Sequence, residues 1–485
     1  MIAREELLDL AADFGLAANV VEKDYALGWV LAALGQHPAT RESWLFKGGT
    51  CLKKCFFETY RFSEDLDFTL LDAAQLDEPF LAKLFDELAA WVYEQTGLEL
   101  SSDARKVEVY TNSRGGRSAE GRISYRGPLA RSGDAPRIKL DLTSDERIVR
   151  GGVRRSVHHP YSDRPDDGIE VSTYSFEELY AEKLRALAER LRPRDLYDVI
   201  HLYRRRELDP DRTIVVEILR EKCAFKAIPV PTLESIRRSP LVAELRAAWD
   251  QMLRHQLPQL PPFEDFWREL PEMFAWLFAG EVRAALPVLE VASAGALDRG
   301  WRAPRMATSW RSFGTSAPLE VVRFAAANRL CVELDYEDES GRRSVRTIEP
   351  YSLRRSSAGT LLLFAVRADS GQSRSYRVDR MIGARASQRS FVPKFVIELS
   401  GSGPIVAPTL ERPPSAIGGG GAASKRRTSS KRPRSFRGGP IYVFRCPVCD
   451  KTFRRSSYDA TLNPHKGKNG WPCYGRVGHH ERADY

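Results

Sequence analysis

What this 485-residue chain lacks narrows its class before any motif is considered. It has seven cysteines, an odd number with three near the C-terminus, which favours metal ligands there over a disulfide framework. No hydrophobic run approaches the length of a membrane-spanning helix, and the N-terminal residues lack the charge and cleavage pattern of a signal peptide. These absences exclude a secreted protein that is held together by disulfide bonds, and they predict a cytoplasmic protein with no membrane contact.

What is present fits a globular protein of several domains. Hydrophobic residues make up 42% of the chain and charged residues 29%, and 485 residues are too many for one core, so we expect two to four domains. Residues 402–485 contain 16 Lys and Arg against 5 Asp and Glu, a net charge of +11, whereas the whole chain carries +9. All of the net positive charge therefore lies in this tail, and residues 1–401 sum to −2.

A glycine pair followed by two aspartates forms the most informative segment. Residues 65–70 alternate polar and apolar side chains as a half-buried strand does, so Asp65 and Asp67 share one face. Two carboxylates this close repel each other unless a divalent cation neutralises them, and their hard oxygens suit Mg²⁺ or Mn²⁺. Upstream, Gly48 and Gly49 would let the backbone approach a phosphate.

A second alternating segment, residues 137–143, provides a third acid, Asp141, between apolar neighbours. Three acids favour a two-metal site, which clamps the attacking and leaving oxygens of a displacement at phosphorus and holds a triphosphate. The hydroxyl of Thr50 or Ser63 would donate to the triphosphate oxygens. Gly-Gly can be a plain turn and Asp-x-Asp a solvated strand edge, but their joint occurrence in this order predicts nucleotidyl transfer.

Four motifs, taken in order, resemble those of the AbiEii/AbiGii toxin-type nucleotidyltransferases of the polymerase-β-like superfamily, over about residues 1–280. The motifs are residues 47–50 with 61–67, residues 139–143, residues 178–187 and residues 194–198. The resemblance implies transfer of a nucleoside monophosphate from an NTP, often by a growth-arresting toxin of phage defence. It also implies transfer RNA 3′ ends as one acceptor class and makes a cognate antitoxin a candidate partner.

The same resemblance assigns roles to individual residues. Asp65, Asp67 and Asp141 would hold Mg²⁺ (or Mn²⁺) and, with Lys183, Asp195 and Asp198, form the catalytic set. The residues that would bind the nucleotide are Gly48, Gly49, Thr50, Arg61, Ser63 and Lys183.

Lys183 lies in a helix expected over residues 174–192. The apolar stripe of that helix consists of Leu179, Leu184, Leu187 and Leu191. By spacing alone Lys183 is a surface lysine beside the stripe, whereas by the resemblance its ammonium neutralises charge on the leaving pyrophosphate. Asp195 and Asp198 open the next helix, where the helix dipole also favours acids, and either would orient Lys183 or accept a proton from the attacking hydroxyl.

The next two segments carry no chemistry that we can identify. Residues 205–280 predict a helical cap, because large aromatic side chains recur three or four residues apart as core positions do. These aromatic residues include Trp249, Phe263, Phe266, Trp267, Phe274 and Phe278. Residues 281–318 predict a helix followed by a polar connector.

Short strands separated by turn residues follow a helix expected at residues 319–328, which predicts a small barrel. Three of the expected strands are residues 331–336, 361–366 and 395–399.

Residues 346–353 and 374–380 resemble the WYL domain, an Sm/SH3-like barrel that often senses nucleic-acid or nucleotide ligands. This chain departs from the pattern at residues 361–363, where three leucines stand in place of Trp-Tyr-Leu. Arg377 and Arg380 are candidates for phosphate contacts, or belong to a solvated basic face.

The C-terminal 45 residues contain the spacing C-x2-C-x15-H-x7-C, formed by Cys446, Cys449, His465 and Cys473. These soft ligands suit tetrahedral Zn²⁺, and four protein ligands leave no open position, so the zinc would be structural. The alternative is three free cysteines and a surface histidine. Residues 424–437, after a run of four glycines, form a basic arm that would attract phosphate backbones or merely keep the linker in solution.

The sequence thus predicts an α+β multidomain protein. Its expected parts are a polymerase-β-like nucleotidyltransferase core (1–204), its helical cap (205–280), a connector (281–318), a WYL-like β-barrel (319–401), a basic flexible linker (402–440) and a Cys₃His zinc module (441–485). Its expected activity is Mg²⁺-dependent transfer to RNA. The alternatives are a transferase that modifies a protein hydroxyl, and a nucleic-acid-binding regulator with an inactive transferase domain.

Overall fold

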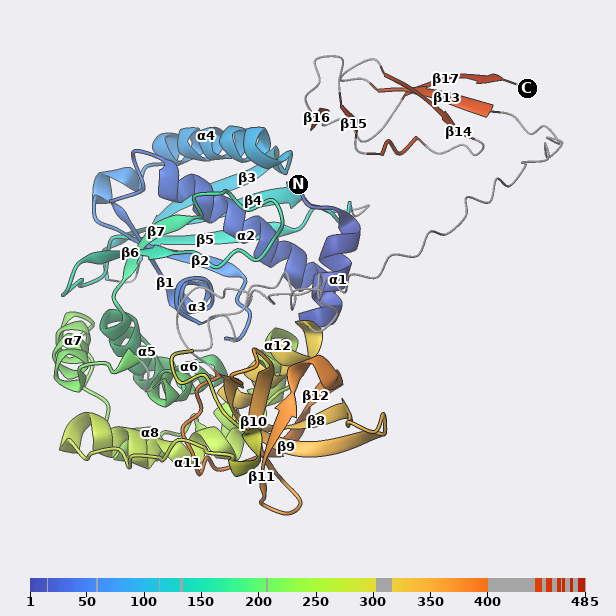
Figure 1. Ribbon diagram of the computed structural model, residues 1–485. Helices are drawn as coiled ribbons and strands as arrows, with labels where there is room; N and C mark the ends of the chain where they lie inside the picture. The colour runs from blue at the N-terminus through green and yellow to red at the C-terminus, as the bar shows by residue number, and fades with distance from the viewer. Residues whose placement is uncertain are drawn as a thin grey trace, which may run out of the picture. The chain divides into compact units, whose positions relative to one another are not determined.

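The computed structural model describes residues 1–14, 16–57, 60–112, 114–130, 134–205, 208–301, 316–399, 441–446, 451–455, 460–463, 465–466, 472–473 and 479–484. The chain forms two compact units, Met1–Glu411 and Arg412–Tyr485 (Figure 1). The predicted basic linker, residues 402–440, lies outside the described residues.

A seven-stranded mixed sheet is the base of the first unit, with the order β3-β4-β5-β2-β1-β7-β6. The strands are β1 (Trp44–Lys47), β2 (Asp65–Leu70), β3 (Glu99–Thr111), β4 (Arg117–Arg126), β5 (Arg137–Thr143), β6 (Gly152–Ser156) and β7 (Glu170–Tyr174). β2 pairs with β5 and β1 with β7 in parallel, and the other pairs are antiparallel. The sheet therefore brings together strands that lie far apart in the sequence.

One face of this sheet is apolar and covered by helices. The helices are α2 (Ala18–Gln36) and α4 (Glu78–Thr96), and α1 (Arg4–Phe14) packs against α2. In α4 the buried residues recur three or four apart, and the ring of Phe85 lies so close to Gly121 of β4 that a Cβ there would stand 2.8 Å from it. In β5, Ile138, Leu140 and Leu142 are buried while the residues between them are partly exposed. The alternation leaves a polar, accessible face on the other side of the sheet.

Two further helices follow strands β1 and β7, and two more continue the chain after the second of these. They are α3 (Gly48–Cys51), which continues into a π-helical turn over Leu52–Phe56, then α5 (Phe176–Arg190), α6 (Pro193–Arg204) and α7 (Arg212–Phe225). Ser175 caps α5 by accepting from the Glu178 N–H, and Leu191, in the left-handed region at φ 46°, ends it. Pro193 then begins α6. The predicted apolar stripe of α5 is confirmed, because all four leucines are buried.

The segment predicted as a helical cap is helical. Its helices are α8 (Leu233–Arg237), α9 (Val242–Ala247), α10 (Trp249–Leu253) and α11 (Phe263–Phe274), which ends in a π-helical turn over Ala275–Ala279. The Trp249 ring packs against Phe263 and Phe266 at centroid distances of 5.4 and 5.2 Å, so these aromatic residues form core.

The helix predicted after residue 281 is wrong as far as residue 301, because the described segment 281–301 contains only a 3₁₀ turn at Ala292–Ala294. Leu289 and Val291 are buried against Tyr351 and Phe364. Two buried side chains thus hold this mainly exposed segment against the second sheet, and that packing outweighs its helical spacing.

A second sheet has the order β11-β10-β9-β8-β12, and all its pairs are antiparallel. Its elements are α12 (Ser316–Ala327), β8 (Leu330–Glu337), β9 (Arg343–Arg355), β10 (Leu361–Arg367), β11 (Ser373–Arg377) and β12 (Met381–Ser390). No hydrogen-bonded pairing joins β11 to β12 within residues 316–399, and closure into the predicted Sm/SH3-like barrel stays a prediction. The strand predicted at residues 395–399 is wrong, because Val396 and Glu398 each donate one backbone hydrogen bond, to Pro287 and Tyr351, without forming a ladder.

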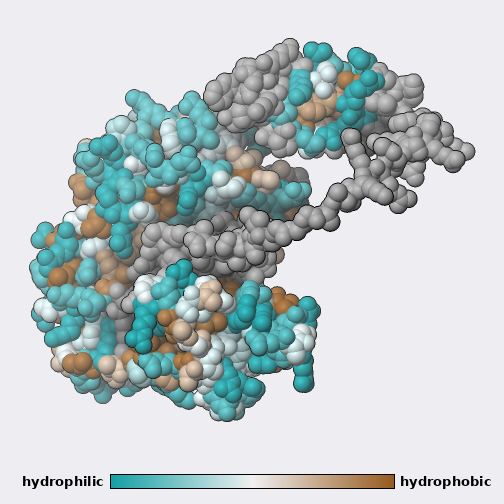
Figure 2. Space-filling view, viewed as in Figure 1, coloured by the Kyte–Doolittle hydropathy of each residue, from teal (hydrophilic) through white to brown (hydrophobic). Residues whose placement is uncertain are grey.

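The second unit contains a three-stranded sheet with the order β14-β13-β17 and a two-stranded one. The strands are β13 (Ile441–Arg445), β14 (Thr452–Arg455), β15 (His465–Lys466), β16 (Pro472–Cys473) and β17 (His479–Asp484). Its small core consists of Phe444, Cys446 and Leu462. None of the described helices of the chain is both long enough and apolar enough to cross a membrane, and the face seen in Figure 2 is mainly hydrophilic.

Candidate functional site

The three predicted metal ligands lie on the open face of the first sheet. In the parallel pair of β2 and β5, Asp67 is opposite Asp141 and Asp65 is opposite Lys139. Because residues two apart and residues directly opposite share a face, the three carboxylates point to the same side. Lys47, the last residue of β1, is opposite Asp67 on the other side of β2.

The glycine turn packs directly against this carboxylate face. Gly48 begins α3 at φ +79°, and a Cβ on it would lie 2.1 Å from an oxygen of Asp67. A Cβ on Gly49 would lie 2.7 Å from the guanidinium of Arg61 and 3.1 Å from the hydroxyl of Ser63. Any side chain at either position would displace a site residue, which explains why both are glycine.

The two predicted hydroxyl donors have different surroundings. The Thr50 hydroxyl is buried and donates to the backbone carbonyl of Asp65, so it fastens α3 to the start of β2. Ser63 is partly exposed, and its hydroxyl makes no hydrogen bond within the described residues. Ser63 is therefore the better placed of the two to meet a phosphate oxygen.

Arg61 and Lys183 share one buried carboxylate. Asp198 accepts hydrogen bonds from Arg61 Nε at 2.8 Å and Nη2 at 2.9 Å, and Lys183 Nζ lies 2.8 Å from its Oδ2. The side chain of Asp198 is fully buried, whereas that of Lys183 is 10% exposed. Burial alone would raise the pKa of Asp198, but the charges of Arg61 and Lys183 outweigh it and hold that pKa below its ordinary value.

Asp195 makes a different contact. Its two oxygens accept hydrogen bonds from Nη2 and Nε of Arg190, both at 2.8 Å. This ion pair links the end of α5 to the first turn of α6. Asp198, and not Asp195, therefore positions Lys183. The sequence left both open because both stand in the first turns of the same helix.

The carboxylates fit a divalent cation by their electrostatics. Burial raises the pKa of Asp67 to about 6, against the lowering effect of Lys47 and Lys183, and the charges of Asp141 and Asp65 add to the increase. A cation with a preference for oxygen ligands would relieve this repulsion. The three carboxylates share a sheet face without being gathered around one point, because no three His, Cys, Asp or Glu side chains within the described residues lie close enough together to hold one ion.

Arg194 is a site residue to which the sequence assigned no role. It is the second residue of α6, it is partly buried, and its Nε has no hydrogen-bond partner in the described part of the chain. Burial and the like charge of Arg61 lower its pKa, whereas Asp65 and Asp198 act in the opposite direction. The motif at residues 194–198 includes Arg194, but spacing alone gave no reason to single it out.

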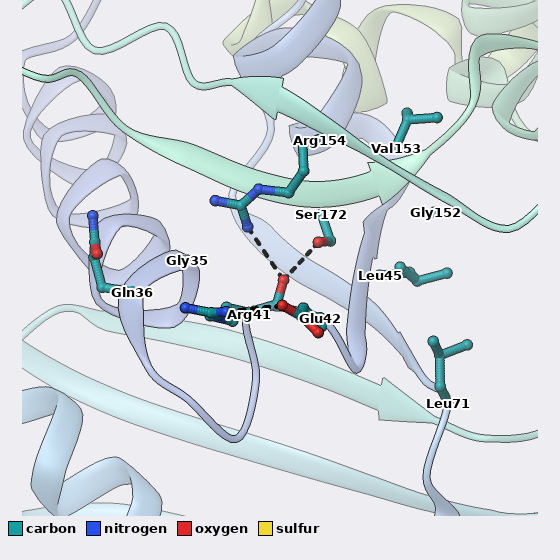
Figure 3. A pocket seen from close by; sticks show the side chains of 10 residues that line it. All are labelled: Gly35, Gln36, Arg41, Glu42, Leu45, Leu71, Gly152, Val153, Arg154 and Ser172. Carbon is teal, nitrogen blue, oxygen red and sulfur yellow. Dashed lines mark hydrogen bonds and ion pairs between the residues drawn. The ribbon is translucent and has the colours of Figure 1, made fainter.

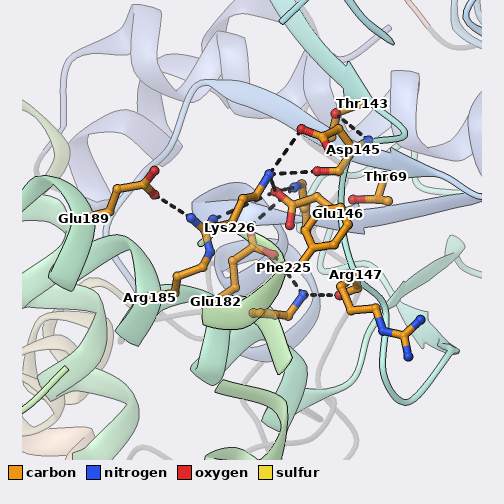
Figure 4. Close-up of polar contacts among 12 residues, drawn as sticks. Thr69, Thr143, Asp145, Glu146, Arg147, Glu182, Arg185, Glu189, Phe225 and Lys226 are labelled. Atoms are coloured by element: carbon orange, nitrogen blue, oxygen red, sulfur yellow. Dashed lines mark hydrogen bonds and ion pairs between the residues drawn. The ribbon is translucent and has the colours of Figure 1, made fainter. Parts of the chain in front are cut away.

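Lys47 belongs to a buried ionic network, of which Figure 4 labels Glu146, Glu182 and Lys226. Its Nζ lies 3.5 Å from Glu182 of α5 and 3.6 Å from Glu146, and Glu146 also lies 3.3 Å from Lys226 of α7. Burial alone would lower the pKa of Lys47, but the carboxylates of Glu182 and Glu146 outweigh it and raise that pKa. The network joins β1 to helices α5 and α7.

A pocket of about 550 Å³ lies at the other end of β1 and β2 (Figure 3). Leu45 and Leu71 lie at the ends of these strands that face away from Gly48 and Asp65. The pocket is lined by Gly35, Gln36, Arg41, Glu42, Leu45, Leu71, Gly152, Val153, Arg154 and Ser172. None of the three carboxylates lines it, so it is separate from the site described above.

The predicted zinc ligands are only partly described. Cys449 lies outside the described residues, as does the side chain of Cys473. The backbone register pairs His465 with Cys473, and Cys446 is buried. In the second sheet, Arg377 and Arg380 make ion pairs with Asp379 and Glu339, at 2.7 and 3.1 Å, so both are already partnered.

Comparisons with known proteins match two parts of the chain. The family model described as "Nucleotidyl transferase AbiEii toxin, Type IV TA system" matches residues 29–275, just over half of the chain, and the model described as "WYL domain" matches residues 318–386. No curated protein matches.

Several solved structures are similar at low identity. MenT4, a nucleotidyltransferase toxin of Mycobacterium tuberculosis, is 18% identical over 59% of this chain and 91% of its own, with a TM-score of 0.41. JHP933 of Helicobacter pylori is 16% identical over 55% and 94%, with a TM-score of 0.35. The proteasome accessory factor PafBC of Arthrobacter aurescens is 18% identical over 45% and 32%, with a TM-score of 0.15.

Proposed function

The chain belongs to the AbiEii nucleotidyltransferase toxin family and carries a WYL domain, and from that premise we propose that it transfers a nucleoside monophosphate from an NTP to RNA. The acceptor that we propose is a transfer RNA 3′ end, and the setting is a toxin–antitoxin or phage-defence system with a cognate antitoxin. One observation carries the proposal: Asp65, Asp67 and Asp141 share an open sheet face beside the Gly48–Gly49 turn.

The proposed site residues have different roles in the transfer. Asp65, Asp67 and Asp141 would hold Mg²⁺, which, when bound, supplies positive charge to the triphosphate and to the attacking oxygen. Gly48 and Gly49 would let the triphosphate approach the backbone of α3, and Ser63 would donate its hydroxyl to a phosphate oxygen.

Lys183 would face the leaving pyrophosphate. Its carboxylate partner, Asp198, already has the full charge of Arg61 beside it, so two positive charges share one negative charge. The excess positive charge is buried, where it acts on a nearby phosphate more strongly than in water. Lys183 would thereby stabilise the charge that develops as pyrophosphate leaves.

The C-terminal part would bring RNA to the transferase. The net charge of +11 over residues 402–485 favours contact with phosphate backbones. We propose that residues 441–485 form a Cys₃His zinc module and that residues 402–440 form its basic linker. We also propose domain boundaries at residues 204, 280 and 318.

The test is an incorporation assay on the full-length protein. Purified protein, total cellular RNA, Mg²⁺ and one radiolabelled NTP at a time are incubated, and RNA is then resolved from protein. Asp67→Asn removes a proposed metal ligand, and Asp72→Asn, on an exposed turn after the same strand, is the matched control.

Label on RNA that Asp67→Asn abolishes and Asp72→Asn retains supports the proposal and identifies the nucleotide. Label on protein instead would replace RNA by a protein hydroxyl as acceptor. Incorporation that Asp67→Asn leaves intact would refute the assignment of the site, and no label with any NTP would favour the regulator.

A further inference from the structure

Asp141 is held by a lysine on its own strand. Lys139 Nζ lies 2.9 Å from Oδ1 of Asp141 and 3.0 Å from Oδ2, so one ammonium contacts both oxygens. The same ammonium lies 3.1 Å from an oxygen of Glu120 on β4. Both oxygens that Asp141 would offer a cation are therefore already engaged with Lys139.

The register puts Lys139 among the other acids as well. It is opposite Asp65 in the pairing of β2 with β5, and its own strand neighbour on this face, Asp141, is opposite Asp67. An ammonium at this position balances carboxylates that would otherwise repel one another. The ammonium of Lys139 thus offsets part of the carboxylate charge that a divalent cation would offset.

Lys139 differs from the other cations near this site in its freedom to move. Lys183 is held by the buried Asp198, and Lys47 lies between the largely buried Glu146 and Glu182. The side chain of Lys139, in contrast, is 37% exposed. It can leave Asp141 for Glu120 or for water without leaving a buried charge behind.

We propose that Lys139 is a displaceable counter-ion of the metal site: it occupies Asp141 in the absence of metal and must give that carboxylate up when a divalent cation binds. The inference rests on the proposed function, because it requires Asp65, Asp67 and Asp141 to be the metal ligands. Lys139 is then a positioning residue. It offsets part of the negative charge of the carboxylate face and weakens the binding of metal alone, so that the site favours a cation that arrives with a triphosphate.

Direct measurement of Mn²⁺ binding tests this without any turnover. Free Mn²⁺ is followed by electron paramagnetic resonance during titration of the full-length protein, at fixed ionic strength and without nucleotide. Lys139→Met should bind Mn²⁺ about tenfold more tightly than the wild type, the scale expected when one unit charge is removed a few ångströms from a divalent cation in a partly hydrated site. Lys139→Arg, which keeps the charge, should stay within about twofold of the wild type.

Arg137→Met is the matched control. Arg137 lies two residues upstream on the same face of β5, is exposed, and makes no ion pair within the described residues, so its loss should change Mn²⁺ affinity by no more than about twofold. An affinity of Lys139→Met equal to or weaker than wild type would overturn the inference, as would an equal gain in Arg137→Met or in Lys139→Arg.

Asp67→Asn separates this inference from the proposed function. If Mn²⁺ binds and Asp67→Asn abolishes it while Lys139→Met binds as the wild type does, the metal site stands and only the role of Lys139 is refuted. Binding that Asp67→Asn does not weaken would refute the metal site and the inference together.

Discussion

Asp198→Asn should unfold more readily and lose transfer activity together. Asp198 is fully buried, and its partners are nearly so, with Arg61 3% and Lys183 10% exposed at contacts of 2.8 Å. The substitution keeps the shape but leaves two buried cations without a negative charge. Breaking a buried ion pair in this way costs about 3–5 kcal/mol, so the free energy of unfolding should fall by about that amount.

Two further variants make the measurement specific. Lys183→Met removes the ammonium proposed to face the pyrophosphate, so it should abolish transfer. Because the pair of Arg61 and Asp198 stays intact, the free energy of unfolding should fall by only about 1 kcal/mol. Asp195→Asn should also cost about 1 kcal/mol, because its partner Arg190 is 48% exposed and can turn to water. Urea unfolding followed by tryptophan fluorescence gives the stabilities, and the incorporation assay gives the activities.

The difference in free energy of unfolding between wild type and Asp198→Asn should depend on pH in a direction set by the sign of the pKa shift of Asp198. The pKa of Asp198 is lowered on folding, so the ionised carboxyl contributes stability that is complete above the unfolded pKa of about 4 and is lost as pH falls through the folded pKa. The stability gap between wild type and Asp198→Asn should therefore be constant from pH 8 to pH 5 and narrow only below about pH 4. A gap under 1 kcal/mol at pH 7, or one that closes between pH 7 and pH 5, would refute the reasoning.

Three more substitutions test other parts of the arrangement. Gly48→Ala places a Cβ against Asp67 at a positive φ and should lower kcat/KM by about 100-fold with folding retained, and near-normal activity would contradict the packing. Arg194→Ala should raise KM for the NTP about tenfold with little change in kcat, and an unchanged KM would remove Arg194 from the nucleotide site. Lys222→Met deprives the buried Glu178 of its partner at 2.8 Å and should lower the free energy of unfolding by about 3–5 kcal/mol at unchanged KM, and a shifted KM would connect this pair to the nucleotide.

Local pattern was sufficient for the elements that carry the chemistry. The alternation of residues 65–70 and 137–143 identified two strands with acids on one face, and both strands are present. The leucine spacing identified α5 and its buried side. Local pattern failed at residues 281–301 and 395–399. There, backbone hydrogen bonds and side-chain packing to residues far away in the sequence outweigh the local helix or strand propensity.

The sequence by itself therefore determined the family, the order of its motifs and which acids share a strand face, because strand and helix periods depend only on neighbouring residues. Only the tertiary structure decided that β2 pairs with β5, so that Asp67 meets Asp141. Only the tertiary structure shows that Lys183 forms an ion pair with Asp198 and that Lys139 forms one with Asp141. Strand partners and the allocation of buried hydrogen bonds are set by contacts between residues far apart in the chain, and no local period encodes them.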